Sequence, residues 1–584
     1  MTKDQQTRKD IIYDLETYPN CFTFCAVFAN GKGLRVYEIS DRKDETDKML
    51  EFLRNLLKNQ YRMVGFNCLA FDYPIMHHIL LKAKKAFKDG KQPKFTAKEL
   101  YGIAQDLIEG MKSNDRFGNS IKDSEIIISQ VDLYKIWHFD NKARSTSLKM
   151  LEFNMRSENI EDLPFPVGTN LDDKQKAELI KYNKHDVLET LKFYRYSQEA
   201  LKLREELTEL FGFDCTNFND TKIGKQLFIN SLEKAAPGCC YAVTERGRKI
   251  RQTKRDKIVI KDCLFPYIKF KRPEFQALHE WFKRQVITET KGVFADIEEH
   301  DLGELAQYAE LVVKRKKFKG KPTDEERQEF LQQHPLGWIE EEELKATEYV
   351  FDENGEHVME YPLTEFGLPD ESKKPKKKRR QKISYWGCWK IAETLNVVIN
   401  GFRYDEGLGG VHGSISGKVE EDDNFLIIDC DVSSMYPNLA ISNNAHPAHL
   451  GTTFCKVYKR LYDERKSHPK GSAANAALKL ALNGVYGDSG NEYSPLYDPA
   501  YMMSITCSGQ MSILMLVERL IDVGCEVIQC NTDGVTCKVP KSKENDYYSA
   551  CRDWESVVKL DLEYCYYSKM FIRDCNNYIA VYKE

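Results

Sequence analysis

Hydrophobic and polar positions in the first two hundred residues follow two different periods. Short apolar runs at 9–17 (KDIIYDLET), 61–67 (YRMVGFN) and 124–137 (SEIIISQVDLYKIW) predict strands, because they are brief and rich in β-branched residues. Stretches 47–59 and 173–207 instead repeat apolar residues every three to four positions, which predicts amphipathic helices. Strands that alternate with helices in this way are typical of an α/β domain with a central sheet.

A regular spacing of hydrophobic and polar residues returns after residue 400. A strand is predicted at 424–432 (NFLIIDCDV), and helices are predicted at 451–468, 472–487 and 508–524. The stretch 529–539 (QCNTDGVTCKV) then predicts two short strands and a tight turn, in which Asp-Gly would supply the positive φ angles of a hairpin loop. This order predicts a sheet platform with an inserted helical lobe.

The segment 216–400 between these parts has more charged residues and a less regular spacing of hydrophobic residues. It contains the run 373–382, in which eight of ten residues are Lys or Arg. A nuclear localisation signal or a phosphate-binding arm has this composition, but a solvent-exposed loop is the simpler interpretation. Because 584 residues exceed what one hydrophobic core organises, we expect three or more domains.

Composition restricts the class of protein but does not identify its binding partner. With 42% hydrophobic and 30% charged residues the chain is typical of soluble globular proteins, and a net charge of −4 does not exclude a locally basic groove. The seventeen cysteines include the adjacent Cys239 and Cys240 but no CxxC unit, so we expect reduced thiols. We find no apolar run near the roughly 18 residues of a membrane helix and no secretory signal, and we expect an unanchored cytoplasmic protein.

Carboxylates gather at three places in the N-terminal domain. Asp14 and Glu16 end the first strand and point to the same side, because side chains alternate along a strand. Asp72 follows the second strand and its turn, and Asp186 lies on a helix one turn after Tyr182. Neighbouring carboxylates repel one another unless a cation lies between them, and Mg²⁺ prefers such oxygen ligands.

The motifs DLET, NCLAFD and YNKHD, in this order, resemble those of the tyrosine-containing branch of the DEDD 3′–5′ exonucleases. The resemblance implies a ribonuclease H-like fold and two Mg²⁺ ions, for which Mn²⁺ can substitute. It implies metal ligands at Asp14, Glu16, Asp72 and Asp186, a water-orienting hydroxyl at Tyr182, and contacts to the DNA strand end at Asn67 and Phe71. His185 is not at the spacing of the histidine branch, and Asp132 is expected to be structural or part of a substrate groove.

A second set of motifs occupies the C-terminal part. Asp431 ends a strand and precedes VSSMYPN, a helical KLALNGVYG segment follows, and Asp533 lies at the tip of the predicted hairpin. These resemble motifs A, B and C of family B DNA polymerases. Together with the exonuclease motifs ahead of them, they resemble a phage-type enzyme with proofreading. Two carboxylates on neighbouring strands can hold the two divalent ions that nucleotide addition needs.

The resemblance implies roles for further residues. Asp431 and Asp533 become catalytic metal ligands, and the residues expected to contact the nucleotide are Tyr436, Lys479, Asn483, Tyr486 and Arg465. A solvated helix face is an equally open interpretation of Arg465. DNA contacts are implied at Gly409, Gly410, Thr532 and Tyr578, where the glycine pair would let the backbone approach phosphates.

The chain also departs from the family pattern. Asn531 replaces the first aspartate of motif C, Gly534 its serine, Gly484 the serine of motif B, and Asn576 the lysine of the primer grip. Six residues follow Tyr578, and the thumb expected after this point is absent. We therefore expect a fragment or one half of a split polymerase with a separate thumb-carrying polypeptide, in preference to a thumb substitute from 216–400.

The sequence thus predicts an α/β multidomain protein, with a ribonuclease H-like exonuclease domain followed by a family B palm and fingers. The expected domains are an exonuclease (1–215), an intervening domain (216–400), palm segments (401–450 and 488–584) and fingers (451–487). The expected function is template-directed synthesis from dNTPs on a nucleic-acid-primed DNA template, with proofreading, in phage replication in the infected cytoplasm. Replication accessory proteins are expected partners, and no membrane is. Two alternatives stay open: an exonuclease with an inactive polymerase half, and a non-enzymatic half that binds primer-template.

Overall fold

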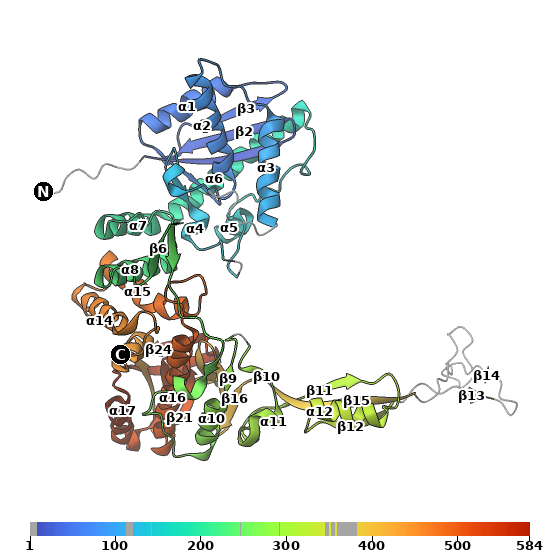
Figure 1. The fold of residues 1–584 in the computed structure, drawn as a ribbon, viewed down its shortest axis with the longest axis vertical. Helices are drawn as coiled ribbons and strands as arrows, with labels where there is room; N and C mark the ends of the chain where they lie inside the picture. Colours follow the sequence, from blue (N-terminus) through green and yellow to red (C-terminus); the bar gives the residue numbers. More distant parts are fainter. Residues whose placement is uncertain are drawn as a thin grey trace. The chain divides into compact units, whose positions relative to one another are not determined.

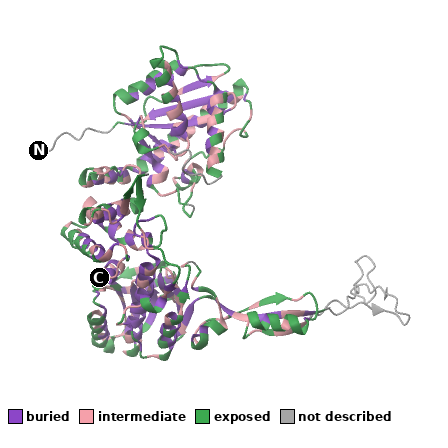
Figure 2. Ribbon diagram, in the orientation of Figure 1, coloured by how far each residue is buried: buried purple, intermediate pink, exposed green. Residues whose placement is uncertain are grey.

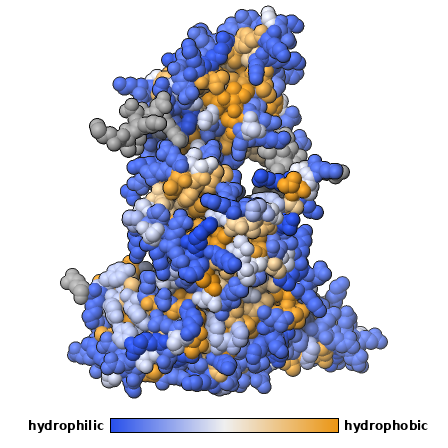
Figure 3. Space-filling model, turned by 60° about the vertical axis from the view of Figure 1, so that its left-hand side comes forward, coloured by the Kyte–Doolittle hydropathy of each residue, from blue (hydrophilic) through white to orange (hydrophobic). Residues whose placement is uncertain are grey.

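The computed structural model describes residues 9–112, 121–141, 143–245, 247–290, 292–344, 350–351, 357–358 and 382–583. The chain is a mixed α/β protein with two compact units, one of residues 1–228 and 461–484, the other of residues 229–460 and 485–584. The boundaries fall inside three helices: α8 (Asp220–Ala235), α14 (Gly451–Ser467) and α15 (Ala473–Ser489). Hydrophilic residues cover most of the face drawn in Figure 3.

The first unit is built on a five-stranded sheet of order β3-β2-β1-β4-β5. β2 runs antiparallel to β1 and β3, whereas β4 and β5 run parallel to β1. The strands are β1 (Asp10–Tyr18), β2 (Cys21–Phe28), β3 (Arg35–Ser40), β4 (Arg62–Gly65) and β5 (Gln130–Asp132). Besides α8, α14 and α15, which the two units share, the first unit has the helices α1 (Thr46–Lys58), α2 (Asp72–Lys88), α3 (Ala97–Lys112), η1 (Asp123–Glu125), α4 (Leu133–Ile136), α5 (Leu148–Asn154), α6 (Asp173–Tyr196) and α7 (Gln198–Phe211). They are drawn in blue to green in Figure 1.

The alternation of side chains along β1 gives the sheet two buried faces. Ile11, Tyr13 and Leu15 belong to a core that includes residues of α1, α2 and α3. Ile12 belongs to a second core with Val187 of α6 and others. Asp14 and Glu16 follow Ile12 at period two, so they lie on the α6 side of the sheet.

Two predicted elements of this unit are shorter than expected. The stretch 124–137 holds a strand over Gln130–Asp132 alone, because the Asp132 carboxylate accepts the Tyr134 N–H at 3.0 Å and so begins α4. The helical stretch 173–207 is divided at Ser197, where α6 ends and α7 begins.

The second unit is built on a nine-stranded sheet of order β16-β17-β18-β21-β22-β20-β23-β19, with β24 paired to β23. Its strands are β16 (Asn396–Ile399), β17 (Phe402–Gly407), β18 (Gly410–Ser414), β19 (Gly417–Glu420), β20 (Phe425–Val432), β21 (Glu526–Asn531), β22 (Gly534–Pro540), β23 (Leu562–Asp574) and β24 (Asn577–Tyr582). The helices that accompany it are α9 (Ile260–Cys263), α10 (Pro273–Arg284), α13 (Met435–Ser442), α16 (Pro499–Asp522), η3 (Lys541–Lys543) and α17 (Glu544–Val558).

Helix α16 is the central helix of the second unit and packs against α9, α13 and α17. Its buried residues run along most of its length, which appears purple in Figure 2. By length and composition it could cross a membrane, so the expectation that the chain lacks such an apolar run was wrong. Inside the protein, however, 89% of its most apolar window is buried, as in the core helix of a globular unit.

The region after α8 carries smaller sheets. Strands β6 (Tyr241–Thr244) and β7 (Gly247–Ile250) pair, as do β8 (Ile258–Val259) with β9 (Val286–Ile287) and β13 (Val350–Phe351) with β14 (His357–Val358). A four-stranded sheet contains β10 (Ala295–Glu298), β11 (Val312–Lys317), β12 (Trp338–Leu344) and β15 (Lys382–Thr394), accompanied by α11 (Glu299–Leu302), η2 (Gly303–Gln307) and α12 (Asp324–Gln333). Of the basic run 373–382, all but the backbone of Lys382 lies outside the described residues.

Candidate functional site

Three carboxylates of the first unit meet on one side of its sheet. Asp14 and Glu16 extend from β1, and Asp186 extends from α6, which packs over that side. Ligand oxygens of these three residues all lie within 4.8 Å of one another. Asp72 begins α2, and its Oδ1 accepts the Leu15 N–H at 3.3 Å, which places it beside the same strand.

Burial and mutual repulsion make these four acids hard to ionise. Burial, then the charges of neighbouring acids, raise the pKa of Asp14 and Glu16 well above the ordinary range. Burial raises the pKa of Asp72 to about 8, although the Leu15 N–H opposes this, and raises the pKa of Asp186 to about 7. A set of buried carboxylate oxygens of this kind fits hard divalent cations such as Mg²⁺ or Mn²⁺, which would favour the ionised forms.

Tyr182 lies one turn before Asp186 on α6, is buried, and shares a hydrogen bond with the Asp186 carboxylate. Burial, then the charge of Asp186, raise the pKa of Tyr182 far above that of an ordinary phenol. The hydroxyl is therefore protonated at neutral pH and can donate a hydrogen bond.

Asn183 positions Asp14 and was missed from the sequence. Its Nδ2 donates to Asp14 Oδ2 at 2.6 Å, and its Oδ1 accepts the Thr23 hydroxyl at 3.0 Å. Asn183 is fully buried. The signal was present, because Asn183 lies three residues before Asp186 and therefore shares its helix face.

The loop between β4 and α2 carries Asn67 and Phe71. Asn67 has a φ of 60°, and its N–H donates to Asp132 Oδ1 at 2.9 Å, while the Leu69 N–H donates to Asp132 Oδ2 at 3.0 Å. Asp132 is fully buried, so of the two expectations for this residue its contacts match the structural one. Phe71 is half-buried immediately before Asp72.

His185 contacts a buried acid. Its Nε2 is 3.1 Å from Oε2 of Glu152 on α5, which is 1% exposed. Glu152, His185 and Asp186 also form a group whose ligand atoms lie within 4.8 Å of one another.

A separate set of acids lies in the second unit, on the sheet formed by β20, β22 and β23. Asp431 of β20 pairs in register with Gly534 of β22 and with Glu563 of β23. Asp533 lies in the two-residue loop between β21 and β22, and its carbonyl oxygen accepts the Val432 N–H at 2.6 Å. Asp429, two residues before Asp431, lies on the same side of β20 and accepts the Thr536 hydroxyl at 2.7 Å.

These acids also influence one another. Asp431 is exposed to solvent, yet partial burial of its carboxylate, then the charges of Asp533, Asp429 and Glu563, raise its pKa to about 7. Burial raises the pKa of Asp533 and of Asp429. Asp429 and Glu563 were missed from the sequence. Asp429 could have been found from its period-two spacing, whereas Glu563 needs the register of β23.

Gly534 is required for space, not for its backbone angles. A Cβ atom at this position would lie 2.7 Å from Asp431 Oδ1. Neither Asp533 nor Gly534, both within the described part of the chain, has a positive φ, so the predicted Asp-Gly hairpin chemistry was wrong. The glycine that replaces the expected serine thus leaves room for the Asp431 carboxylate beside the hairpin.

Two tyrosines hold the glycine loop that precedes β18. Tyr436 donates to the Gly409 carbonyl, Tyr486 donates to the Leu408 carbonyl, and the two rings lie 4.5 Å apart between centroids. Tyr486 also shares a hydrogen bond with Thr506 of α16. The structure therefore brings together residues predicted to contact nucleotide and residues predicted to contact DNA.

The other side of this loop contacts the hairpin. A Cβ on Gly410, whose φ is 143°, would lie 2.6 Å from Thr532. Thr532 Oγ1 lies 3.1 Å from Nε2 of His412, and Asn531 Oδ1 accepts the Thr532 N–H at 3.0 Å. Tyr578 lies on β24, 44% exposed, and the charges of Asp429 and Asp431 add to the burial that raises its pKa.

The remaining predicted nucleotide contacts belong to the first unit. Lys479 and Asn483 are exposed on one face of α15, four residues apart, and Arg465 is half-buried in the last turn of α14. Their position relative to Asp431 and Asp533 stays a prediction.

No family model matches the chain, and no curated protein matches it. Among solved structures, the chain is similar to the family B DNA polymerase from the hyperthermophilic archaeon Pyrobaculum calidifontis, with 14% sequence identity and a TM-score of 0.43. The match covers 100% of this chain and 60% of that chain, so this chain spans less than two thirds of that protein. A likeness of this size says nothing about individual residues.

Proposed function

We propose that this chain is a phage-type family B DNA polymerase with 3′–5′ exonuclease activity. The observation that carries the proposal is the arrangement around Asp431 and Asp533, which adjacent strands bring together beside the tyrosine-held loop 408–410. The motif resemblance in the sequence assigns polymerase chemistry to these same residues. Primer-template DNA and dNTPs are the proposed substrates.

At the polymerase site, Asp431 and Asp533 would hold two divalent cations. When bound, such ions at either site supply Lewis-acid activation of the attacking oxygen and stabilise the leaving oxygen. Tyr436 would lie beneath the incoming sugar, in the position fixed by its hydrogen bond to Gly409. Lys479 and Arg465 would neutralise the triphosphate, and Tyr486 and Asn483 would pack against the new base pair.

At the exonuclease site, Asp14, Glu16, Asp72 and Asp186 would hold the cations. Tyr182, protonated and hydrogen-bonded to Asp186, would orient the attacking water. Asn67 and Phe71 would hold the strand end. The strand order β3-β2-β1-β4-β5, with β2 antiparallel to β1 and β4 and β5 parallel to it, supports a ribonuclease H-like form for this unit.

One observation favours a second candidate, an exonuclease whose polymerase half is inactive. Among the described residues, a group of three possible metal ligands within 4.8 Å includes Asp14, Glu16 and Asp186, whereas no such group includes Asp431 or Asp533. The exonuclease site is therefore the more completely assembled of the two for cation binding.

A primer-template assay with Mg²⁺ and four dNTPs distinguishes the candidates. The proposal predicts primer extension that Asp533→Ala abolishes, while Asp553→Ala, which removes an exposed acid from α17, leaves extension unchanged. Degradation without extension would favour the exonuclease candidate. Loss of both activities with salt-dependent duplex binding preserved would favour a non-enzymatic binding half and overturn the proposal.

A further inference from the structure

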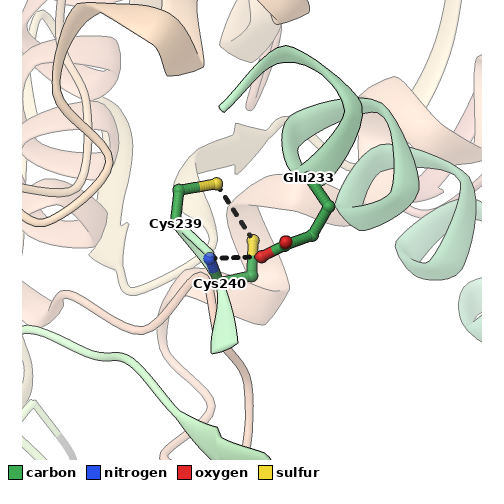
Figure 4. Close-up of side chains that lie close together, drawn as sticks. All are labelled: Glu233, Cys239 and Cys240. Atoms are coloured by element: carbon green, nitrogen blue, oxygen red, sulfur yellow. Dashed lines mark hydrogen bonds between the residues drawn. The ribbon is translucent and has the colours of Figure 1, made fainter. Parts of the chain in front are cut away.

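The turn after α8 brings an acid and two adjacent cysteines together, away from both carboxylate sites in the sequence. Glu233 lies in the last turns of α8, and Cys239 and Cys240 lie in the turn that precedes β6. Figure 4 shows the two sulfur atoms and the Glu233 carboxylate pointing toward one another. Their ligand atoms all lie within 4.8 Å of one another.

The Glu233 carboxylate is fixed by the backbone of this turn. Its Oε2 accepts the Gly238 N–H at 2.8 Å, and its Oε1 accepts the N–H groups of Cys240 and Tyr241 at 2.7 and 3.2 Å. Burial alone would raise the pKa of Glu233, but these three donors hold it below the ordinary value. These bonds use three of the roughly four lone-pair sites of the carboxylate, so one site on Oε2 stays available for a cation.

The two sulfur atoms already have the spacing of a zinc thiolate. They are 3.7 Å apart. Two thiolates bound to one tetrahedral Zn²⁺ at about 2.3 Å have their sulfurs roughly 3.8 Å apart, from the tetrahedral angle. A disulfide instead needs sulfurs at about 2.05 Å and Cα atoms about 4.4–6.8 Å apart, whereas adjacent residues have theirs at about 3.8 Å. The pair therefore fits one bridging cation better than it fits oxidation.

We propose that Glu233, Cys239 and Cys240 bind one thiophilic divalent cation with the ligand chemistry of Zn²⁺. Cys239 is half-buried and Cys240 is fully buried, so the fourth ligand is a water on the open side of Cys239. This site lies within the second unit and does not depend on the proposed polymerase or exonuclease function.

Burial raises the pKa of both thiols, so the pair carries its protons in the absence of the cation. Binding forms two metal–sulfur bonds and releases both thiol protons to solvent, with no change of oxidation state. The cation would tie the end of α8 to the start of β6, because its ligands come from both sides of the turn.

The test is a titration of the full chain, kept reduced with a phosphine, with Co²⁺ followed by Zn²⁺. We expect a sulfur-to-cobalt charge-transfer band that saturates at one equivalent and disappears on Zn²⁺ addition. Cys239→Ser should weaken binding at least tenfold and remove most of the band. The matched control is Cys575→Ser, a half-buried cysteine of the β23–β24 turn, and it should retain the band.

A second measurement on the wild-type chain keeps the proposal testable if a variant fails to fold. With Mg²⁺ in excess to occupy the carboxylate sites, an indicator dye in weak buffer should record two protons released for the first equivalent of Zn²⁺ bound. Absence of the charge-transfer band in the wild type, an unchanged band in Cys239→Ser, or binding without proton release would each overturn the proposal.

Discussion

At the scale of single residues, Gly534 leaves room for the Asp431 carboxylate in its present orientation. Because a Cβ at 534 would lie 2.7 Å from Asp431 Oδ1, Gly534→Ala must displace that carboxylate from its present position. We expect primer extension to fall about tenfold or more, since misplacing a catalytic group by a fraction of an ångström is costly. Exonuclease activity should not change. Gly320→Ala, which adds a Cβ in open space, is the control.

Equal extension rates in Gly534→Ala and Gly320→Ala would contradict this account of the glycine. A thermal unfolding curve of each variant separates a local effect on catalysis from a loss of stability.

The raised pKa values of the exonuclease acids predict a pH dependence of stability. The pKa values of Asp72 and Asp186 are about 8 and 7, against roughly 3.9 for an unfolded aspartate. The folded state therefore binds more protons than the unfolded state between these limits, and its stability falls as pH rises from about 4 to 8. In EDTA the unfolding temperature of the first unit should fall by a few degrees between pH 5 and 8.

Asp72→Asn should reduce this fall, because asparagine cannot ionise, and added Mg²⁺ should reduce it in the wild type. Asp106→Asn, at an exposed position on α3, is the control. An unfolding temperature that rises over this range, or an identical fall in Asp72→Asn, would show that these carboxyls are not buried in protonated form.

Asn531 tests the importance of the first acid position of motif C. Its Oδ1 accepts the Thr532 N–H at 3.0 Å, and an aspartate oxygen can accept the same bond. We expect Asn531→Asp to change extension by less than about threefold, within the cost of one hydrogen bond. A large gain or loss in a primer-extension assay would mean that position 531 contributes to cation binding.

At the scale of elements, the loop 408–410 accepts hydrogen bonds from three helices, because Thr506 of α16 donates to the Leu408 carbonyl at 3.2 Å beside the two tyrosines. Tyr436 comes from α13 and Tyr486 from α15, and each donates to a carbonyl of the loop. Tyr486→Phe removes the bonds to Leu408 and Thr506, but Thr506 still donates to the Leu408 carbonyl, so we expect a net loss of about 1 kcal/mol and a looser loop. We expect extension to fall about fivefold, in line with that free energy, with exonuclease activity unchanged.

Tyr493→Phe is the matched control for Tyr486→Phe, because Tyr493 is 76% exposed. A parallel loss of both activities in Tyr486→Phe would mean that the hydroxyl supports folding of the chain instead of the loop.

The helices and strands also show which features of the fold could be predicted from the sequence. Helix α14 and the hairpin β21–β22 follow directly from local periodicity. Glu563 could not be placed, because its pairing with Asp431 depends on the long-range register of β23. The sequence left Asp132 open between a structural role and a substrate groove, because its bonds to the 67–69 loop come from a turn that no local pattern reveals.

At the scale of the whole molecule, each unit contains its own set of acids. Asp14, Glu16, Asp72 and Asp186 lie in the first unit, and Asp429, Asp431, Asp533 and Glu563 lie in the second. Motif order could predict two separate sites. The division of α14 and α15 between the units could not be predicted, because it depends on packing and not on periodicity.

The most direct test of the central claim uses a primer with a mismatched 3′ end on a DNA template, with Mg²⁺ and four dNTPs. The wild-type chain should remove the mismatch and then extend the primer. Asp14→Ala should leave the mismatch in place, and Asp533→Ala should shorten the primer without extending it. Loss of both removal and extension in either folded variant, or extension that survives Asp533→Ala, would contradict two separate sites with these assignments.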